Sequence, residues 1–170
     1  PVFRYADALF IKAECLLRVG REKQTAADLI TEVRKRSFPT SVAKATRSIA
    51  DLEGGSVYAY GHDEYTGTPD ANGNVAVTDW SGYISTSEGG DDIILGGLLD
   101  DLGWEFCCEL HRRQDLRRFQ MTDGRNVWNG KSWFCKDATT STTYDWYCIP
   151  ETAMKTNSKL DQNPGYATAN

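Results

Sequence analysis

The sequence contains no uninterrupted apolar run that approaches the roughly 18 residues of a transmembrane helix. Its first five residues also lack the charged and apolar regions of a signal peptide, so any export signal is expected on a part of the protein outside these 170 residues. The formal net charge is -5, and the basic residues are scattered or paired with acids. Because a basic patch is missing, no nucleic-acid partner is expected.

Motifs for nucleotide or nucleophilic chemistry are also missing. No glycine loop could cradle a phosphate, and no Ser/His/Asp or Cys/His arrangement has supporting context. His111 is two residues from Glu109, so the two side chains would point about 200° apart on a helix. His62 has no companion at ligand spacing. We therefore expect no catalytic residue, no metal site built on histidine and no organic cofactor.

Calcium remains an alternative in one segment. Residues 70–74 place oxygen ligands at alternate positions, as calcium loops do, but the glycine is misplaced and no glutamate follows at the twelfth position. A hairpin turn at Asn72-Gly73 is the simpler interpretation.

The five cysteines do not fix the redox compartment. Cys107 and Cys108 are neighbours on a predicted helix, where they would point in different directions, so we expect two small core residues that do not bridge each other. Cys135 and Cys148 flank a predicted hairpin and could pair across it. Two buried thiols are the other interpretation of that pair.

The composition that is present is typical of a folded globular domain. Hydrophobic residues make up 40% and charged residues 25%, which favours neither disorder nor a membrane span. A chain of 170 residues can bury a sizeable core, so one domain is expected.

The first 36 residues predict two helices in a hairpin. Apolar residues recur at helical spacing from residue 3 to Val19, and the helix is expected to end at Gly20. A second helical pattern runs over residues 22–36. The pair has roughly the length of a tetratricopeptide repeat, and a single repeat of this kind cannot bury both of its faces. We therefore expect the chain to begin within a longer helical array.

The remainder predicts a mainly α fold with minor β structure. Residues 37–92 predict a long, irregular, aromatic-rich surface segment, and residues 93–119 predict one long charged helix. Residues 126–135 and 144–149 predict two strands of a hairpin. A one-turn helix with Pro150 in its first position and a turn at residues 163–165 are expected to close the chain.

The charged residues of the long helical segment could be catalytic or structural. Glu105 and Glu109 lie four apart and could form a catalytic pair, but glycosidase carboxylates come from separate elements about 5 to 9 Å apart. Arginines follow Glu109 at helical spacing, and others lie near Asp115. We therefore expect a structural ion-pair network of Glu105, Glu109, Arg112 and Asp115.

Aromatic side chains in the irregular segment are the functional signal. Sugar rings present apolar faces to aromatic planes, and residues 78–83 supply aromatic and hydrogen-bonding groups together. We expect Trp80 and Tyr83 to contact a ligand, with Tyr58 and Tyr60 as weaker candidates. The alternative is that these rings only hold the loop against the body of the protein.

Three separated segments form a pattern. The first is residues 4–14 (RYADALFIKAE) followed by residues 33–36 (VRKR), the second is residues 102–119 (LGWEFCCELHRRQDLRRF), and the third joins Ile149-Pro150 and Asn157 to residues 160–166 (LDQNPGY). In this order they resemble the C-terminal part of the SusD/RagB family. The pattern departs from the family at Leu110, where glycine is common, and at Cys107-Cys108.

The resemblance implies a function that composition and spacing do not show. Such proteins are about three times this length and are lipid-anchored at the bacterial outer membrane. They bind oligosaccharides or other nutrients without catalysis and hand them to a TonB-dependent transporter. A repeat-type protein-interaction scaffold and a glycan hydrolase are the alternatives, which binding only to a protein, or turnover of a glycan, would favour.

Overall fold

The computed structural model describes residues 3–58, 60, 63–65, 71, 83–85, 88–131 and 146–166, with residues 63–65 and 83–85 described as backbone. Helices dominate these residues, which confirms the expected mainly α class. Within the described ranges, no helix is both long enough and apolar enough to cross a membrane.

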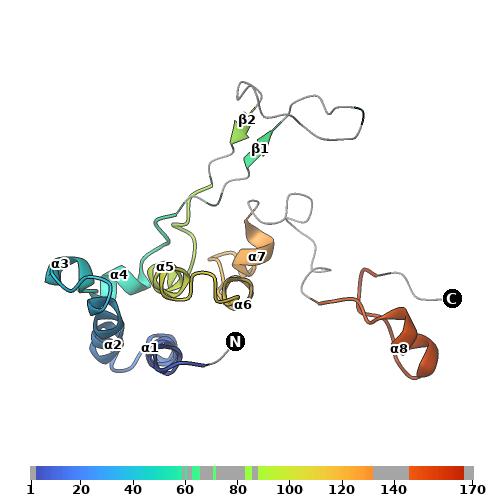
Figure 1. Ribbon diagram of the computed structural model, residues 1–170, viewed down its shortest axis with the longest axis horizontal. Helices are drawn as coiled ribbons and strands as arrows, with labels where there is room; N and C mark the ends of the chain where they lie inside the picture. Colours follow the sequence, from blue (N-terminus) through green and yellow to red (C-terminus); the bar gives the residue numbers. More distant parts are fainter. Residues whose placement is uncertain are drawn as a thin grey trace.

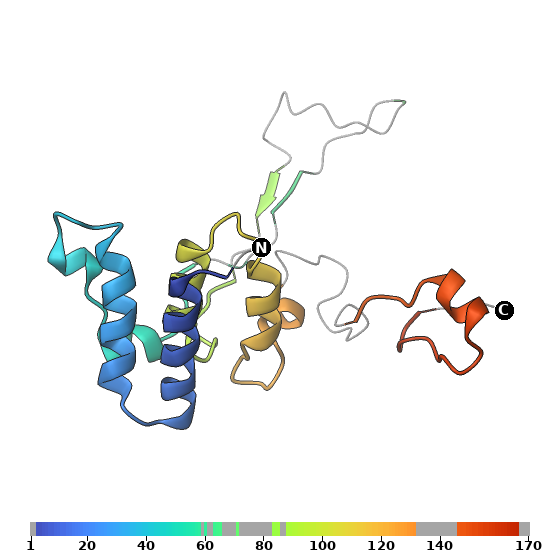
Figure 2. The same ribbon diagram turned by 60° about the horizontal axis from the view of Figure 1, so that its bottom comes forward.

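Helices α1 (Tyr5–Val19) and α2 (Lys23–Lys35) form the predicted hairpin and pack side by side (Figure 2). Gly20 ends α1 as predicted, with a left-handed φ of 73° that glycine adopts without strain. Ala13 on α1 and Ala26 and Ala27 on α2 are fully buried. Such small side chains let the two helices approach closely.

The segment expected to be irregular contains two short helices, α3 (Val42–Ala45) and α4 (Ile49–Glu53). Ser48 caps α4 by accepting a hydrogen bond from the backbone N–H of Asp51, whose side chain accepts one from the N–H of Ser48 in return. Leu52 of α4 is fully buried against the body of the protein. An irregular description is therefore wrong for this part of the segment.

A two-stranded arm follows, formed by β1 (Asp63–Tyr65) and β2 (Tyr83–Ser85). The strands are antiparallel, with Asp63 opposite Ser85 and Tyr65 opposite Tyr83. Figure 1 shows the arm projecting away from the layer of helices. At its base, the backbone N–H of Tyr60 donates to the carbonyl of Glu88 over 2.6 Å.

The single long helix expected over residues 93–119 is wrong. Two helices occupy this stretch, α5 (Gly96–Glu105) and α6 (Arg112–Arg118), separated by a turn over residues 106–111. Cys108 and Leu110 have φ values of 63° and 65°, a left-handed backbone that interrupts a right-handed helix. The turn folds α6 back so that Leu116 is fully buried.

The same turn overturns two parts of the expectation for the adjacent cysteines, their burial and their different directions, whereas both are free thiols as expected. Cys107 and Cys108 are exposed and do not belong to the core. Their sulfur atoms lie 3.8 Å apart instead of pointing to different sides of a helix. The reason is that neither residue is in helical conformation.

The start of α5 packs directly on backbone. A Cβ added to Gly97 would lie 1.7 Å from the carbonyl oxygen of Asp51, and one added to Gly96 would lie 2.1 Å from the nitrogen of Ser56. The N–H of Gly97 donates to the carbonyl of Gly54 over 3.1 Å. Only glycine permits this close contact between α5 and the segment that leads to the arm.

The C-terminal region corrects both predicted strands, since residues 146–149, the described part of the second one, form no strand. Residues expected to begin a strand form α7 (Val127–Gly130), because the side chain of Asn126 caps the first turn. Helix α8 (Glu151–Thr156) forms where a helix was predicted, with Pro150 as its N-cap instead of its first residue, and the expected turn places Gly165 at a φ of 87°. Residues 132–145 lie outside the described part, so a pairing of Cys135 with Cys148 is not described, but Cys148 is exposed, which contradicts the interpretation of two buried thiols.

The core lies between the α1–α2 hairpin and helices α4, α5 and α6. Its apolar side chains come from every one of these helices. The residues with no measurable exposure are Ala13, Ala26, Ala27, Ile30, Leu52, Leu98, Leu99, Leu116 and Phe119.

Candidate functional site

An open groove of about 520 Å³ lies where the end of α5 and the α5–α6 turn face the base of the arm. It brings together aromatic rings, one arginine and the two adjacent thiols. The lining residues are Tyr58, Tyr60, Leu102, Gly103, Trp104, Phe106, Cys107, Cys108, Leu110 and Arg112.

Trp104, in the last turn of α5, presents a partly exposed indole ring to the groove. Its side chain is 58% exposed. The ring lies 6.5 Å from that of Phe38, and the guanidinium of Arg34 lies 6.0 Å from it. These contacts support the indole from behind, so the ring is held in place while much of its surface meets solvent.

Tyr58 is the second partly exposed ring, at 38%. Its backbone N–H donates to the hydroxyl of Ser56, which fixes the segment. Partial burial, and then the nearby carboxylate of Asp100, raise the pKa of Tyr58 above its ordinary value. The phenol therefore stays protonated at neutral pH and can both donate and accept a hydrogen bond.

Tyr60 occupies a different position, since its side chain is only 1% exposed. Its hydroxyl lies 3.0 Å from that of Ser56 and accepts a hydrogen bond from Arg112 over 3.2 Å. Burial raises the pKa of Tyr60. Tyr60 thus forms part of the groove wall rather than a surface on which a ring could stack.

Arg112, the first residue of α6, crosses the groove floor. Its guanidinium donates to the carbonyl of Leu99 over 2.8 Å as well as to the hydroxyl of Tyr60. A Cβ added to Gly103 would lie 2.8 Å from Nη1 of Arg112, so the glycine makes room for the arginine to pass over α5. One side chain therefore links α5, α6 and the base of the arm.

A buried carboxylate holds the segment that carries Tyr58. Asp100 accepts hydrogen bonds from the hydroxyl of Ser56 and from the backbone N–H of Val57, the latter over 2.8 Å. Burial raises the pKa of Asp100 more than these hydrogen bonds lower it. Asp100 is only 3% exposed and is occupied by these contacts, so it is unavailable for contact with a ligand.

Arg4, which precedes α1, holds in place the α5–α6 turn that lines the groove. Arg4 forms ion pairs with Glu105 and Glu109, and Arg36 forms a second ion pair with Glu105. The guanidinium of Arg4 also lies 4.7 Å from the ring centre of Phe106. Its hydrogen bonds lower the pKa of Glu109.

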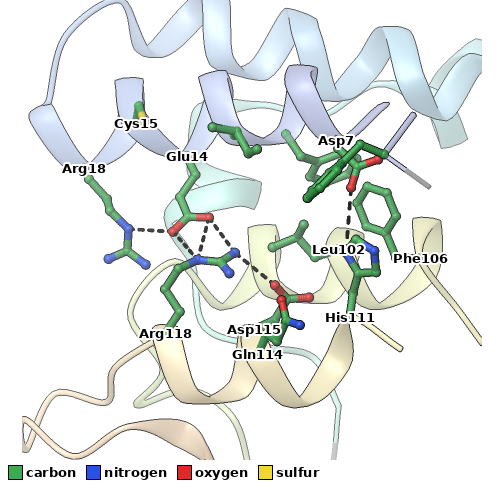
Figure 3. A pocket seen from close by; sticks show the side chains of 13 residues that line it. Asp7, Glu14, Cys15, Arg18, Leu102, Phe106, His111, Gln114, Asp115 and Arg118 are labelled. Atoms are coloured by element: carbon green, nitrogen blue, oxygen red, sulfur yellow. Dashed lines mark hydrogen bonds and ion pairs between the residues drawn. The ribbon is translucent and has the colours of Figure 1, made fainter. Parts of the chain in front are cut away.

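A second pocket, of about 310 Å³, lies between α1, α5 and α6 (Figure 3). Glu14 pairs with Arg18 of the same helix over 2.8 Å and with Arg118 of α6 over 2.9 Å. Burial alone would raise the pKa of Glu14, but the hydrogen bonds from these two arginines outweigh it and lower the pKa. The carboxylate is therefore charged and paired.

Other polar groups of this pocket are also engaged. Asp115 pairs with Arg118 over 2.9 Å, although its Oδ2 atom is buried without a partner among the described residues. Burial raises the pKa of Asp115. His111 stacks on Phe106 at 4.7 Å, with its Nδ1 3.8 Å from the carboxylate of Asp7. The arrangement is that of a packing interface held by ion pairs.

The SusD family matches residues 1–166, almost the full length of the chain. The chain belongs to the SusD family. This confirms the resemblance drawn from three separated segments. The family consists of carbohydrate-binding proteins and not of enzymes, as that resemblance implied.

One curated relative is the starch-binding protein SusD of Bacteroides thetaiotaomicron. It is 26% identical over 167 residues, which cover 98% of this chain and 21% of that protein. The SusD-family chain therefore spans a minor part of the relative's length. No solved structure matches the chain.

The resemblance to the SusD family bears on Leu110, a residue with left-handed backbone in the α5–α6 turn. Leu110, where the resemblance implied a glycine, has a φ of 65°, which glycine adopts most readily. Its side chain is 84% exposed, so no packing compensates for the backbone conformation. The departure from the family pattern therefore falls on a position where the backbone favours glycine.

The four aromatic residues predicted to contact a ligand are placed unequally. Tyr58 and Tyr60 line the groove, as described above. Tyr83 lies on β2, where only the backbone is described, and Trp80 lies outside the described residues. The sequence prediction missed Trp104. The feature of the sequence that could have identified Trp104 is an aromatic residue within the charged helical segment that does not belong to the buried core.

Of the four charged residues predicted to be structural, Asp115 pairs with Arg118 at helical spacing, whereas Glu109 and Arg112 make contacts that the spacing did not predict. Glu109 bonds to Arg4, far along the chain, because the turn removes the helical spacing to Arg112 and Arg113. Arg112 bonds to a backbone carbonyl and a phenol, as described above. The structural role of Glu105, Glu109, Arg112 and Asp115 remains a prediction.

In the described residues, no group of three or more histidine, cysteine or acidic side chains could hold a metal ion. The calcium alternative concerns residues 70–74, of which only residue 71 is described. It therefore lies outside the described part of the chain.

Proposed function

We propose that this chain forms part of a glycan-binding protein at the bacterial outer-membrane surface, which binds oligosaccharides without catalysis and delivers them to a TonB-dependent transporter. Membership of the SusD family supports the binding role. The name of the starch-binding relative supports a glycan as the ligand. The surface location and the transporter partner are properties that the family resemblance implies.

The observation that carries the proposal is that the exposed indole of Trp104 and the partly exposed phenol of Tyr58 line the same open groove. Sugar rings have apolar C–H faces that pack on aromatic planes, while their hydroxyl groups need hydrogen-bond partners. Tyr58 offers a hydroxyl, and Arg112 has five donors, of which two bond to groups in the described part of the chain. The groove volume is in the range of small-molecule sites.

The arm extends this surface. Tyr58 and Tyr60 lie at its base, and Tyr83 lies on its second strand. We propose that Trp80 and Tyr83 contact the glycan beyond the groove, in the part of the chain best placed to vary with the ligand. The role of the groove does not depend on them.

Calorimetric titration of the full-length protein with a panel of oligosaccharides, led by starch fragments, tests the proposal. Binding without release of shorter products is the expected result. A stacked aromatic ring contributes on the order of 1 to 3 kcal/mol, so Trp104→Ala should weaken binding by roughly tenfold or more. Turnover of the glycan, or binding only to a protein, would contradict the proposal.

Trp146 provides a matched control, since its side chain is 61% exposed and does not line the groove. Trp146→Ala should leave glycan affinity within twofold of the parent. Equal loss of affinity in both variants, or in neither, would show that the groove is not the binding site.

A further inference from the structure

The two adjacent thiols of the groove have no part in the binding function proposed above. Cys107 and Cys108 lie in the turn between α5 and α6, both are exposed, and their sulfur atoms are 3.8 Å apart. Both also line the groove. Cys15 lies on α1 and Cys148 precedes α8, so these exposed thiols belong to other elements.

We propose that Cys107 and Cys108 are a redox site, in which the two neighbouring thiols form a reversible disulfide by exchange with a small-molecule or protein disulfide. The sulfur atoms must approach from 3.8 Å to the bond length of about 2.05 Å. The turn provides the starting geometry, because its left-handed φ at Cys108 brings two consecutive side chains together.

The exchange proceeds in two steps. One cysteine thiolate attacks a sulfur of the incoming disulfide, forms a mixed disulfide and releases one thiolate. The neighbouring thiolate then attacks the protein sulfur of the mixed disulfide and releases the second. The cysteine pair loses two electrons to the incoming disulfide, and two protons pass from the cysteines to the released thiols.

The thiolate is the attacking species, so the reaction depends on pH. The hydrogen bond between the two sulfur atoms raises the pKa of Cys107. Exchange is therefore expected to become faster as the pH rises.

The bond formed here would be a labile one. Consecutive Cα atoms are about 3.8 Å apart, which is shorter than the roughly 4.4 to 6.8 Å that disulfides usually span. Strained disulfides are reduced more readily than structural ones, and exposed ones likewise. The pair therefore suits reversible exchange rather than permanent stabilisation of the fold.

Closure of the bond would alter the groove directly. It replaces two thiol groups by one apolar sulfur bridge and restricts the turn that carries Leu110. Through the turn it also acts on Phe106, which lines the same groove. Any consequence for ligand affinity rests on the proposed glycan-binding role, whereas the redox chemistry does not.

Peptide mass analysis tests the site without any glycan. The folded full-length protein is incubated with oxidised glutathione, its free thiols are alkylated, and it is cut after glutamate. Cleavage after Glu105 and Glu109 releases residues 106–109, a peptide that contains Cys107 and Cys108 and no other cysteine. The expected peptide is unalkylated and lighter than the dithiol by two hydrogen atoms. Treatment with dithiothreitol should return it to the dithiol form, which takes two alkyl groups.

Cys108→Ser is the matched control, since it leaves one thiol in the same turn. It should carry one glutathione instead of an internal bond. The proposal is overturned if the parent peptide takes two alkyl groups after oxidation, carries two glutathiones, or is linked to Cys15 or Cys148. Because no ligand is present, failure of this test and failure of glycan binding are separate results.

Discussion

The carboxylate of Asp101 on α5 forms a buried ion pair with Arg34 on α2. The side chain of Asp101 is 1% exposed, and Arg47 binds the same carboxylate over 2.8 Å. Two arginines from outside α5 therefore converge on one acid. This contact ties the helical hairpin to the helix that carries the groove.

Asp101→Asn should lower the free energy of unfolding by about 3 kcal/mol or more, because it leaves two arginine side chains without a buried partner. Chemical denaturation of the parent and the variant measures the change. Asp123→Asn is the control, since Asp123 is half-exposed and pairs with Arg125 at the surface. Its effect should stay below about 1 kcal/mol. Equal effects would contradict the central role of Asp101.

Leu110→Gly should raise the stability of the protein. A left-handed conformation costs a residue with a Cβ about 1 to 2 kcal/mol, part of which the greater freedom of glycine in the unfolded chain offsets. A net gain of about 0.5 to 1 kcal/mol is expected. Leu110→Ala keeps the Cβ and removes only an exposed side chain, so it should change little. A gain from alanine as large as that from glycine would show that backbone strain is not the cause.

Two carboxylates of the second pocket should affect the acid stability of the protein in opposite directions. The pKa of Glu14 is lowered on folding, so its contribution is present above the ordinary glutamate value of about 4.3 and is lost as the pH falls below it. Glu14→Gln should therefore lower stability at pH 7 and flatten its decline in acid.

The pKa of Asp115 is raised on folding, so the opposite sign applies. Its contribution favours the folded state below the ordinary aspartate value of about 3.9 and is lost as the pH rises above it. Asp115→Asn should therefore remove this loss and make the overall gain in stability steeper as the pH rises above about 4. Denaturation at a series of pH values compares both variants, and shifts of the same sign would contradict the assignment.

Trp80→Ala should weaken glycan binding by roughly tenfold or more while leaving the melting temperature unchanged. The reason is the expected stacking of Trp80 on the ligand at the arm. Calorimetric titration and a thermal melt of the same samples separate the two roles. Unchanged affinity with a melting temperature several degrees lower would show that Trp80 only packs the loop.

The sequence predicted those elements whose boundaries depend on local residues. The α1–α2 hairpin follows from apolar periodicity and Gly20, and α8 follows from Pro150. The break between α5 and α6 could not be predicted in this way. Apolar residues continue at helical spacing through it, and periodicity does not report a positive φ at Cys108 or Leu110.

The candidate site was predictable only in part for a similar reason. The prediction identified Tyr58 from its position in an aromatic-rich segment. Trp104 gains its role from the turn that follows it and from contacts with Phe38 and Arg34, more than 60 residues earlier in the chain. The ion pairs of Arg4 with Glu105 and Glu109 also join residues that only the tertiary structure brings together.

The direct contact of Gly96 and Gly97 with the backbone of residues 51–56 bears on how this protein can change. Backbone packs directly on backbone there. The spacing between α5 and the segment that leads to the arm therefore does not depend on the conformation of any side chain. The side chains that line the groove can then be exchanged without moving its walls apart. A chain built this way can acquire preferences for new ligands by point substitution while its framework stays constant.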